Sequence, residues 1–135
     1  MLFAVAQSIL SAALLLMIVS SAYAGGTLTT ENYTVTIKEH CEEGVVVCDE
    51  VEYVGTNRKT KRSIRLRGRD LFHMCPDDHG DGLGKTPCHH MGHEFRSGNI
   101  FYQVWDWGEL EVWRGAPLPP KGKQLLRELG TWKRD

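Results

Sequence analysis

The sequence lacks the short motifs that identify common enzyme classes. It contains no Gly-x-Ser-x-Gly, no Gly-x-x-x-x-Gly-Lys-Ser/Thr and no His-Glu-x-x-His. These patterns position a nucleophile, a bound phosphate and a catalytic zinc ion respectively. We therefore expect a protein that binds a partner or ligand and is not an enzyme.

The chain also lacks an excess of charge of either sign. Sixteen Lys and Arg residues face seventeen Asp and Glu residues, so the net charge is −1. Proteins that bind nucleic acids are usually clearly basic, because they neutralise phosphates. The balance of charge therefore argues against a nucleic-acid partner.

Charged side chains are missing altogether from residues 1–24. The centre of this segment is apolar, and Ala22 and Ala24 are the small residues that signal peptidase accepts. We predict that 1–24 is a cleaved signal peptide and that 25–135 is a single β-rich domain, periplasmic or secreted. The alternative is a retained membrane anchor, because about 20 apolar residues can span a bilayer.

Cysteine is scarce but even in number, at positions 41, 48, 75 and 88. In a small exported domain, four cysteines suggest two disulfides, for which three connectivities exist. We favour the local pairing, Cys41–Cys48 with Cys75–Cys88, because each loop contains its own turn residues. Each bridge would contribute about 2–3 kcal/mol in the chain-entropy model.

Alternation of apolar and polar residues predicts short strands and no long helix. We expect a small all-β antiparallel barrel or sandwich of about seven strands, with 25–30 as a loose lead-in and a long disulfide-closed loop between Cys75 and Gly92. The segment 123–129 fits either a strand or a helical turn. The expected strands are 33–38, 45–54, 63–67, 93–96, 100–106 and 109–114.

The loop between residues 73 and 93 is rich in histidine, a ligand that zinc and copper prefer. A disulfide between Cys75 and Cys88 would remove both thiolates from any ligand set. The candidate metal ligands are therefore His79, His89, His90 and His93. The alternative is a solvated loop that binds no metal and leaves the protein without a cofactor.

Two further groups of residues predict a surface for a protein partner. An acidic stretch, 39–52, precedes a basic one, 58–69. If the two stretches form neighbouring strands, their charges can pair with each other. The alternative is that the arginines form a surface that attracts an acidic partner. Tryptophan is a frequent anchor at interfaces and is concentrated in 105–113. The candidate contact residues are Arg65, Arg67, Trp105 and Trp107.

Several segments of the chain resemble those of small exported proteins of Gram-negative bacteria. They are Tyr33-Thr-Val-Thr-Ile, Cys41-x6-Cys48-Asp49, Thr86-Pro87-Cys88 and Gly108-Glu-Leu-Glu-Val112. In size, export and expected architecture the chain is also similar to periplasmic lysozyme-inhibitor families. Their inhibitory loop has no residue-by-residue match here, so the resemblance assigns no functional residue.

The sequence thus predicts an exported periplasmic binding protein whose partner is another protein, such as a cell-wall hydrolase that it inhibits or to which it confers immunity. The first alternative is a periplasmic zinc- or copper-binding protein that uses the histidine-rich loop. The second is a structural protein of the cell envelope. Membrane contact is expected only through an uncleaved signal segment.

Overall fold

The computed structural model of the chain describes residues 25–76, 84–118 and 122–135, so the predicted signal peptide lies outside the described residues. The secondary structure of these ranges is all-β, and no helix in them is long and apolar enough to cross a membrane. The strands are β1 (Gly25–Thr30), β2 (Tyr33–Glu39), β3 (Val51–Asn57), β4 (Ser63–Pro76), β5 (Lys85–Ser97), β6 (Ile100–Trp105), β7 (Glu109–Arg114) and β8 (Lys123–Arg134).

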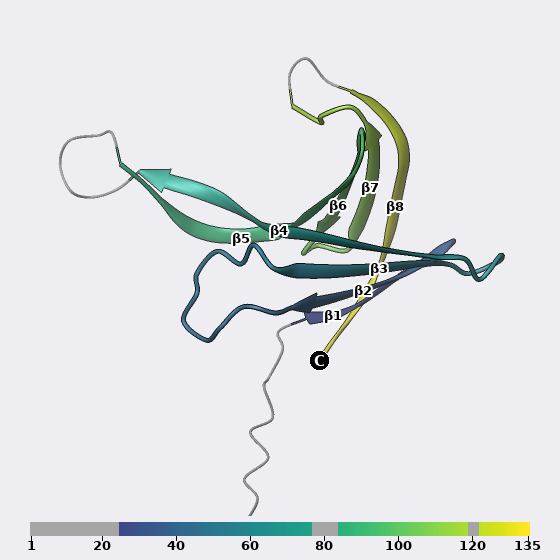
Figure 1. The fold of residues 1–135 in the computed structure, drawn as a ribbon, viewed down its shortest axis with the longest axis horizontal. Coiled ribbons are helices and arrows are strands. Elements are labelled where there is room, and N and C mark those ends of the chain that lie inside the picture. Colours follow the sequence, from purple (N-terminus) through teal and green to yellow (C-terminus); the bar gives the residue numbers. More distant parts are fainter. Residues whose placement is uncertain (1–24, 77–83, 119–121) are drawn as a thin grey trace, which may run out of the picture.

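Each strand pairs antiparallel with the next one in the chain, and β8 pairs with β1 to close a barrel (Figure 1). The long strand β8 closes the barrel by changing partner along its length: Leu129 pairs with Glu109 of β7, and Gly130 pairs with Thr30 of β1. The predicted antiparallel barrel is confirmed, with eight strands where about seven were expected.

The strand that the sequence did not predict is β1. Its glycines and threonines carry little hydrophobic signal, but Leu28 is fully buried and the strand is paired on both sides. The segment after Gly122 is also a strand, which settles the choice left open for 123–129.

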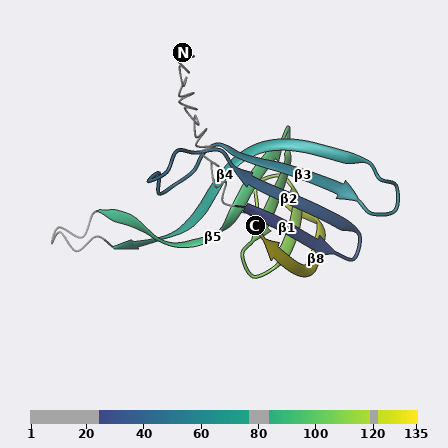
Figure 2. The same cartoon turned by 90° about the horizontal axis from the view of Figure 1, so that it is seen from below.

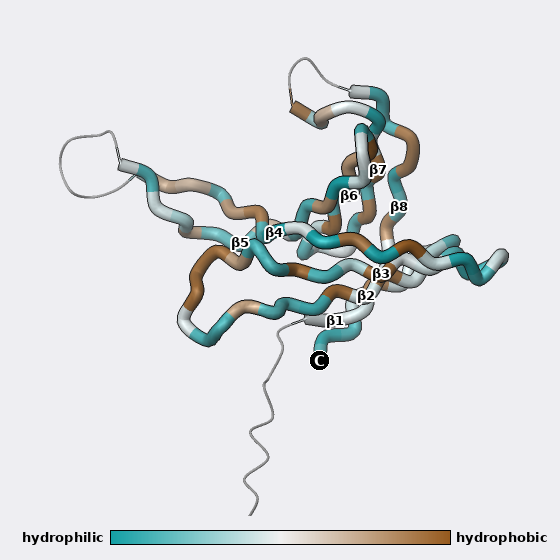
Figure 3. Tube along the Cα trace, viewed as in Figure 1, coloured by the Kyte–Doolittle hydropathy of each residue, from teal (hydrophilic) through white to brown (hydrophobic). Residues whose placement is uncertain are grey.

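Hydrophobic and hydrophilic residues alternate along the strands (Figure 3), and the fully buried core residues come from β1, β2, β3, β5, β6, β7 and the β2–β3 loop. Tyr53 packs against Phe95 and Tyr102, with ring centroids 5.0 and 5.5 Å apart. Burying these side chains supplies most of the driving force for folding, at about 25 cal/mol per Å² of apolar surface. The fully buried apolar residues are Leu28, Val35, Ile37, Cys48, Val51, Tyr53, Phe95, Val104 and Leu110.

Strands β4 and β5 extend beyond their neighbours as a two-stranded arm (Figures 1 and 2). Pairing of β4 with β3 ends at Gly68, and pairing of β5 with β6 begins at Gly92, so the outer parts of both strands pair with each other. The prediction of an irregular loop over Cys75–Gly92 was therefore wrong for Cys75–Pro76, which end β4, and for Lys85–Gly92, which begin β5; residues 77–83 lie outside the described ranges. That segment lacks periodicity because the arm buries neither of its faces continuously.

Both disulfides have the predicted local connectivity. Cys75–Cys88 joins the two strands of the arm, and Cys41–Cys48 closes the β2–β3 loop. The predicted strand over 45–54 begins only at Val51, because Val45, Val46 and Val47 lie exposed in this closed loop. Disulfides of this kind form in oxidising compartments.

Candidate functional site

Four side chains with metal-binding atoms meet where the arm leaves the barrel. They are Glu39 at the end of β2, Asp70 in β4, and His90 and His93 in β5. One nitrogen or oxygen from each lies within 4.8 Å of those of the other three. Asp70 and His93 are almost fully buried, whereas the Glu39 and His90 side chains are 24% and 30% exposed. The cluster is therefore built into the fold but is reachable from one side.

A β-bulge allows both histidines to face the same aspartate. Residues three apart in a regular strand point to opposite faces. In β5, however, Gly92 pairs with Leu71 and His90 pairs with Phe72, so Met91 is an extra residue. The bulge reverses the alternation and turns His90 toward the side on which His93 lies.

Asp70 is at the centre of the cluster. Its Oδ1 lies 2.9 Å from His93 Nδ1 and 3.2 Å from His90 Nε2. Glu39 Oε1 approaches His93 Nδ1 to 3.9 Å. Two imidazole nitrogens and two carboxylates thus converge on one small region.

Groups outside the cluster hold two of these side chains in place. His90 Nδ1 contacts Asp106 Oδ2 at 2.5 Å, which directs His90 Nε2 toward Asp70. The second oxygen of Asp70, Oδ2, accepts a hydrogen bond of 2.9 Å from the amide of Cys48. Arg134 lies 3.6 Å from the other oxygen of Asp106. His90 and Asp70 are therefore each held by one polar atom, while the other polar atom faces the centre of the cluster.

His93 supplies a nitrogen that is buried and unsatisfied. Its Nδ1 is close to Asp70, but the direction of the contact is not that of a hydrogen bond, and no other described residue provides one. A buried polar atom without a partner costs about 1–3 kcal/mol. Coordination of a cation would satisfy it.

Neighbouring charges and burial shift the pKa values of three groups in the cluster. Hydrogen bonding to Asp70 and then to Asp106 raises the pKa of His90 to about 9, against the opposing effect of burial. Burial and the adjacent Asp70 raise the pKa of Glu39 to about 7. Burial acts to raise the pKa of Asp70 as well, but its contacts with the two histidines and the Cys48 amide outweigh burial and lower it. Three carboxyl groups around two imidazoles suit a divalent cation.

The structure brings together two of the four predicted metal ligands. His90 and His93 are in the cluster, whereas His89 lies exposed on the arm opposite His73. His79 lies outside the described residues. His73 is also close to Cys75 and Cys88, but these sulfurs are bonded to each other and provide no thiolate.

The sequence analysis missed Glu39 and Asp70. Both continue the buried phase of their strands: Glu39 follows the buried Val35 and Ile37, and Asp70 follows the inward-facing Leu66 and Gly68. A carboxylate in the buried phase of a strand is the signal that would have found them, since buried charges need a partner or a metal.

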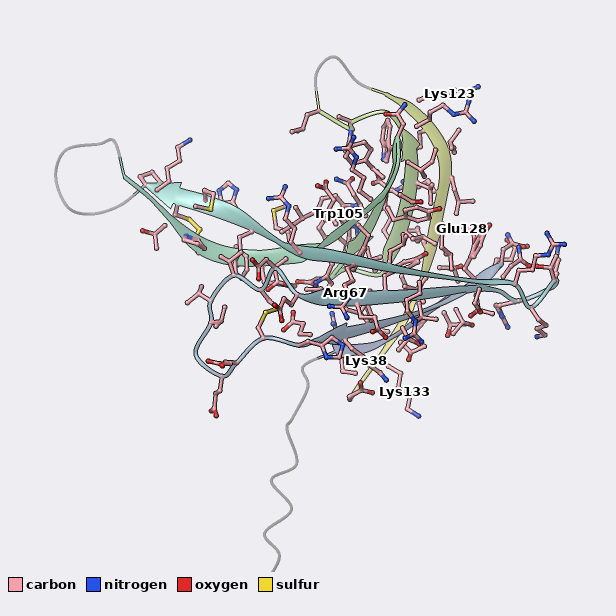
Figure 4. The ribbon with its side chains drawn as sticks, viewed as in Figure 1. Lys38, Arg67, Trp105, Lys123, Glu128 and Lys133 are labelled. Atoms are coloured by element: carbon pink, nitrogen blue, oxygen red, sulfur yellow. A yellow bond between two sulfur atoms is a disulfide. The ribbon has the colours of Figure 1, made fainter. Side chains whose placement is uncertain are left out.

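The predicted contact residues for a protein partner lie in two places. Arg65 and Arg67 are exposed on the outer face of β4, and Arg65 lies 3.8 Å from Glu52 of β3. Trp105 of β6 pairs with Gly92 of β5, which in turn pairs with Leu71 of β4. Leu71 and Arg65 are about 20 Å apart along β4, at about 3.3 Å per residue, so the tryptophan lies far from Arg65. Arg67 and Trp105 are labelled in Figure 4.

The two tryptophans do form one feature. Trp105 and Trp107 stack with their ring planes 9° apart and their centroids separated by 4.7 Å, and Trp107 is 57% exposed. The indole of Trp107 donates a hydrogen bond to Glu109, which also pairs with Arg127 at 2.8 Å. This aromatic pair is fixed in place and its outer ring is available to a partner.

Comparisons of the chain with protein-family models, with curated proteins and with solved structures found no match.

Proposed function

We propose that this protein binds a divalent transition metal ion, Zn²⁺ in the first instance, through Glu39, Asp70, His90 and His93. The observation that carries the proposal is the convergence of four ligand atoms within 4.8 Å, with the histidine and aspartate at its centre anchored from outside. Metal-binding histidines usually donate their second ring nitrogen to a carboxylate, as His90 does to Asp106.

The chemistry of the ligands favours zinc. Two imidazole nitrogens and two carboxylate oxygens provide the four ligands of a tetrahedral zinc site. Neutral imidazole also suits Cu²⁺, whereas Ca²⁺ and Mg²⁺ prefer oxygen alone. The compartment that we propose is the bacterial periplasm or the extracellular space, where both disulfides persist.

Calorimetric titration of the purified, chelator-treated protein with Zn²⁺ tests the proposal. We expect one zinc ion per chain in the wild type. In His90→Ala and Glu39→Ala the affinity should fall by at least about 100-fold, since loss of an outer partner alone costs about 10- to 100-fold. His89→Ala is the matched control, because His89 is exposed and outside the cluster.

Circular dichroism shows whether each variant keeps the barrel, so that loss of binding is not confused with unfolding. A folded wild type that takes up no Zn²⁺ or Cu²⁺ contradicts the proposal. Equal losses in His89→Ala and His90→Ala would place the metal on the arm instead.

A protein partner is a second candidate function, supported by the exposed, stacked Trp107. Interface anchors are frequently tryptophans. The resemblance to lysozyme inhibitors makes a cell-wall hydrolase the first partner to test. We expect the wild-type protein to inhibit lysozyme and Trp107→Ala to inhibit it less. Leu118→Ala is the control, because Leu118 is exposed elsewhere on the surface, and it should inhibit as well as the wild type. Full lysozyme activity at excess protein would rule this partner out.

A further inference from the structure

The barrel has a second concave feature, a pocket of about 490 Å³ at the end of β2 opposite the metal cluster. Tyr33, the first residue of β2, lines the pocket, whereas Glu39, the last residue of β2, belongs to the cluster. Pockets that hold small molecules commonly measure about 300–1,000 Å³ and are mostly apolar. The mouth of a small β-barrel is one of the places where such pockets occur.

The inner wall of the pocket is aromatic. Tyr53 of β3 and Tyr102 of β6 pack against each other on this wall, with ring centroids 5.5 Å apart. Gly55 leaves room for the Tyr53 ring, because a Cβ at this position would lie 2.4 Å from the Tyr53 hydroxyl. The glycine therefore keeps that hydroxyl on the wall of the pocket.

The opposite wall is aliphatic and owes its shape to a β-bulge. Val112 pairs with Leu126 and Trp113 pairs with Gln124, so Leu125 is an extra residue in β8. The bulge brings both Leu125 and Leu126 to the pocket, where they join Leu110 and Val112.

The Tyr53 hydroxyl points to the kind of ligand. Tyr53 is only 2% exposed. Its hydroxyl has no hydrogen bond to a described residue, yet it is not among the buried side-chain atoms that lack a partner, so it is accessible from the pocket. Burial, and then the neighbouring Tyr102 and Tyr33, raise the pKa of Tyr53. The phenol is therefore a neutral donor at physiological pH. A donor that faces the pocket without a protein partner is available to an acceptor on a bound molecule.

We infer that the pocket binds a small, largely apolar molecule that carries a carbonyl-type hydrogen-bond acceptor. The apolar body packs between the tyrosine rings and the leucines of β8, and the acceptor oxygen receives the hydrogen bond of Tyr53. The acceptor assigned to Tyr53 is uncharged, because a neutral phenol provides no charge to offset a buried carboxylate. The cation in the lining is Arg62, which lies between β3 and β4. This inference is independent of the metal site.

Two probes of the same shape test the chemistry of the pocket: 2-acetylnaphthalene, which carries a carbonyl, and 2-ethylnaphthalene, which does not. We expect the purified protein to bind the ketone about fivefold more tightly, the usual net effect of one neutral hydrogen bond. In Tyr53→Phe this preference should disappear while the affinity for 2-ethylnaphthalene stays the same. Stability should not fall, since the hydroxyl has no hydrogen-bond partner among the described residues.

A pair of variants in β8 tests the location. Leu126→Phe narrows the pocket and should lower the affinity for both probes at least tenfold. Leu129→Phe, at an exposed position outside the pocket, should leave both affinities unchanged. Amide shifts of Gly55 and Tyr102 in NMR spectra provide a direct readout of occupancy. Absence of binding, or binding that Leu126→Phe does not affect, overturns the inference. Equal affinity for both probes in the wild type means binding of an adventitious hydrophobe only and overturns the proposed ligand class.

Discussion

Single polar residues in the buried phase of their strands create the cluster of Glu39, Asp70, His90 and His93. Asp70 occupies an inward position of β4 that the alternation reserves for apolar residues. It is retained there because His90, His93 and the Cys48 amide surround it. A buried ionic network of this kind is often less stable than an apolar core, which accords with the metal-binding role that we propose for it.

Asp106→Asn tests the role of the outer partner of His90. The amide keeps the shape of the side chain but removes the carboxylate that orients the imidazole. We expect the Zn²⁺ affinity to fall by about 10- to 100-fold, with the stoichiometry unchanged. Titration calorimetry measures both quantities. Asp135→Asn, at the exposed end of the chain, is the control, and an affinity equal to wild type in Asp106→Asn would exclude an orienting role.

At the scale of elements, the two disulfides are expected to have different roles. Cys41–Cys48 closes the loop that supplies the Cys48 amide to Asp70, and the Asp70 amide donates in return to the Cys48 carbonyl at 2.7 Å. Cys75–Cys88 lies further out, in the arm. The first bridge therefore supports the site, whereas the second supports the arm.

Paired replacements separate these roles. Cys41→Ala with Cys48→Ala should lower the free energy of unfolding by about 2–3 kcal/mol and also weaken Zn²⁺ binding. Cys75→Ala with Cys88→Ala should leave Zn²⁺ affinity within about twofold of wild type. Urea unfolding and zinc titration of both double variants provide the comparison. A loss of zinc affinity only in the second variant would show that the metal lies in the arm.

Strand β8 is tied to the β1–β2 turn by Glu128. Its carboxylate accepts hydrogen bonds from the Thr30 hydroxyl at 2.8 Å and from the amide and side chain of Asn32 at 3.0 Å each. Burial of Glu128 acts to raise its pKa, but the hydrogen bonds from Asn32 and Thr30 outweigh burial and lower it. The ionised carboxylate therefore stabilises the fold above the ordinary pKa of glutamate, and this stabilisation is lost as the pH falls.

Glu128→Gln should accordingly lower the free energy of unfolding by about 1 kcal/mol at pH 7, the typical contribution of such a bond. The difference from wild type should shrink as the pH decreases below about 4.5, the ordinary pKa. Urea unfolding at pH 7 and pH 3.5 measures it. The control is Glu43→Gln in the exposed β2–β3 loop. A difference that grows toward acid pH would contradict the assigned role.

The elements that the sequence predicted are those with a regular period. Alternation located β2, the first five residues of β4, and the β6–β7 hairpin, and loop lengths favoured the correct disulfides. Strand β1 was not predicted, because most of its residues are glycine or threonine and show little hydrophobic alternation. The site was half predicted, because His90 and His93 are conspicuous in the sequence. Glu39 and Asp70 join them only through the sheet register and the bulge at Met91, which the period of the sequence does not encode.

At the scale of the whole molecule, the closed barrel holds two distinct environments. One end carries a polar, charged cluster and the other a tyrosine-lined apolar pocket. Phe95 lies between them, in contact with Tyr53 of the pocket and His93 of the cluster. Ligands that bind only the folded state stabilise it. The barrel as a whole should therefore respond to zinc.

Thermal unfolding measures this response. At a Zn²⁺ concentration about 100 times the dissociation constant, the fold should gain about 2.7 kcal/mol and the Tm should rise on the order of 10 °C. Addition of EDTA should reverse the shift. The Asp70→Asn variant, which loses a central ligand, should show no such rise if it folds, and the same rise in this variant would locate the zinc elsewhere.

X-ray absorption at the zinc edge of the zinc-loaded, desalted protein tests the central claim most directly. Our account predicts one zinc ion per chain with a first shell of nitrogen and oxygen only, including imidazole from His90 and His93. Sulfur in the first shell, at the thiolate distance of about 2.3 Å, or the complete loss of zinc on desalting, would contradict it.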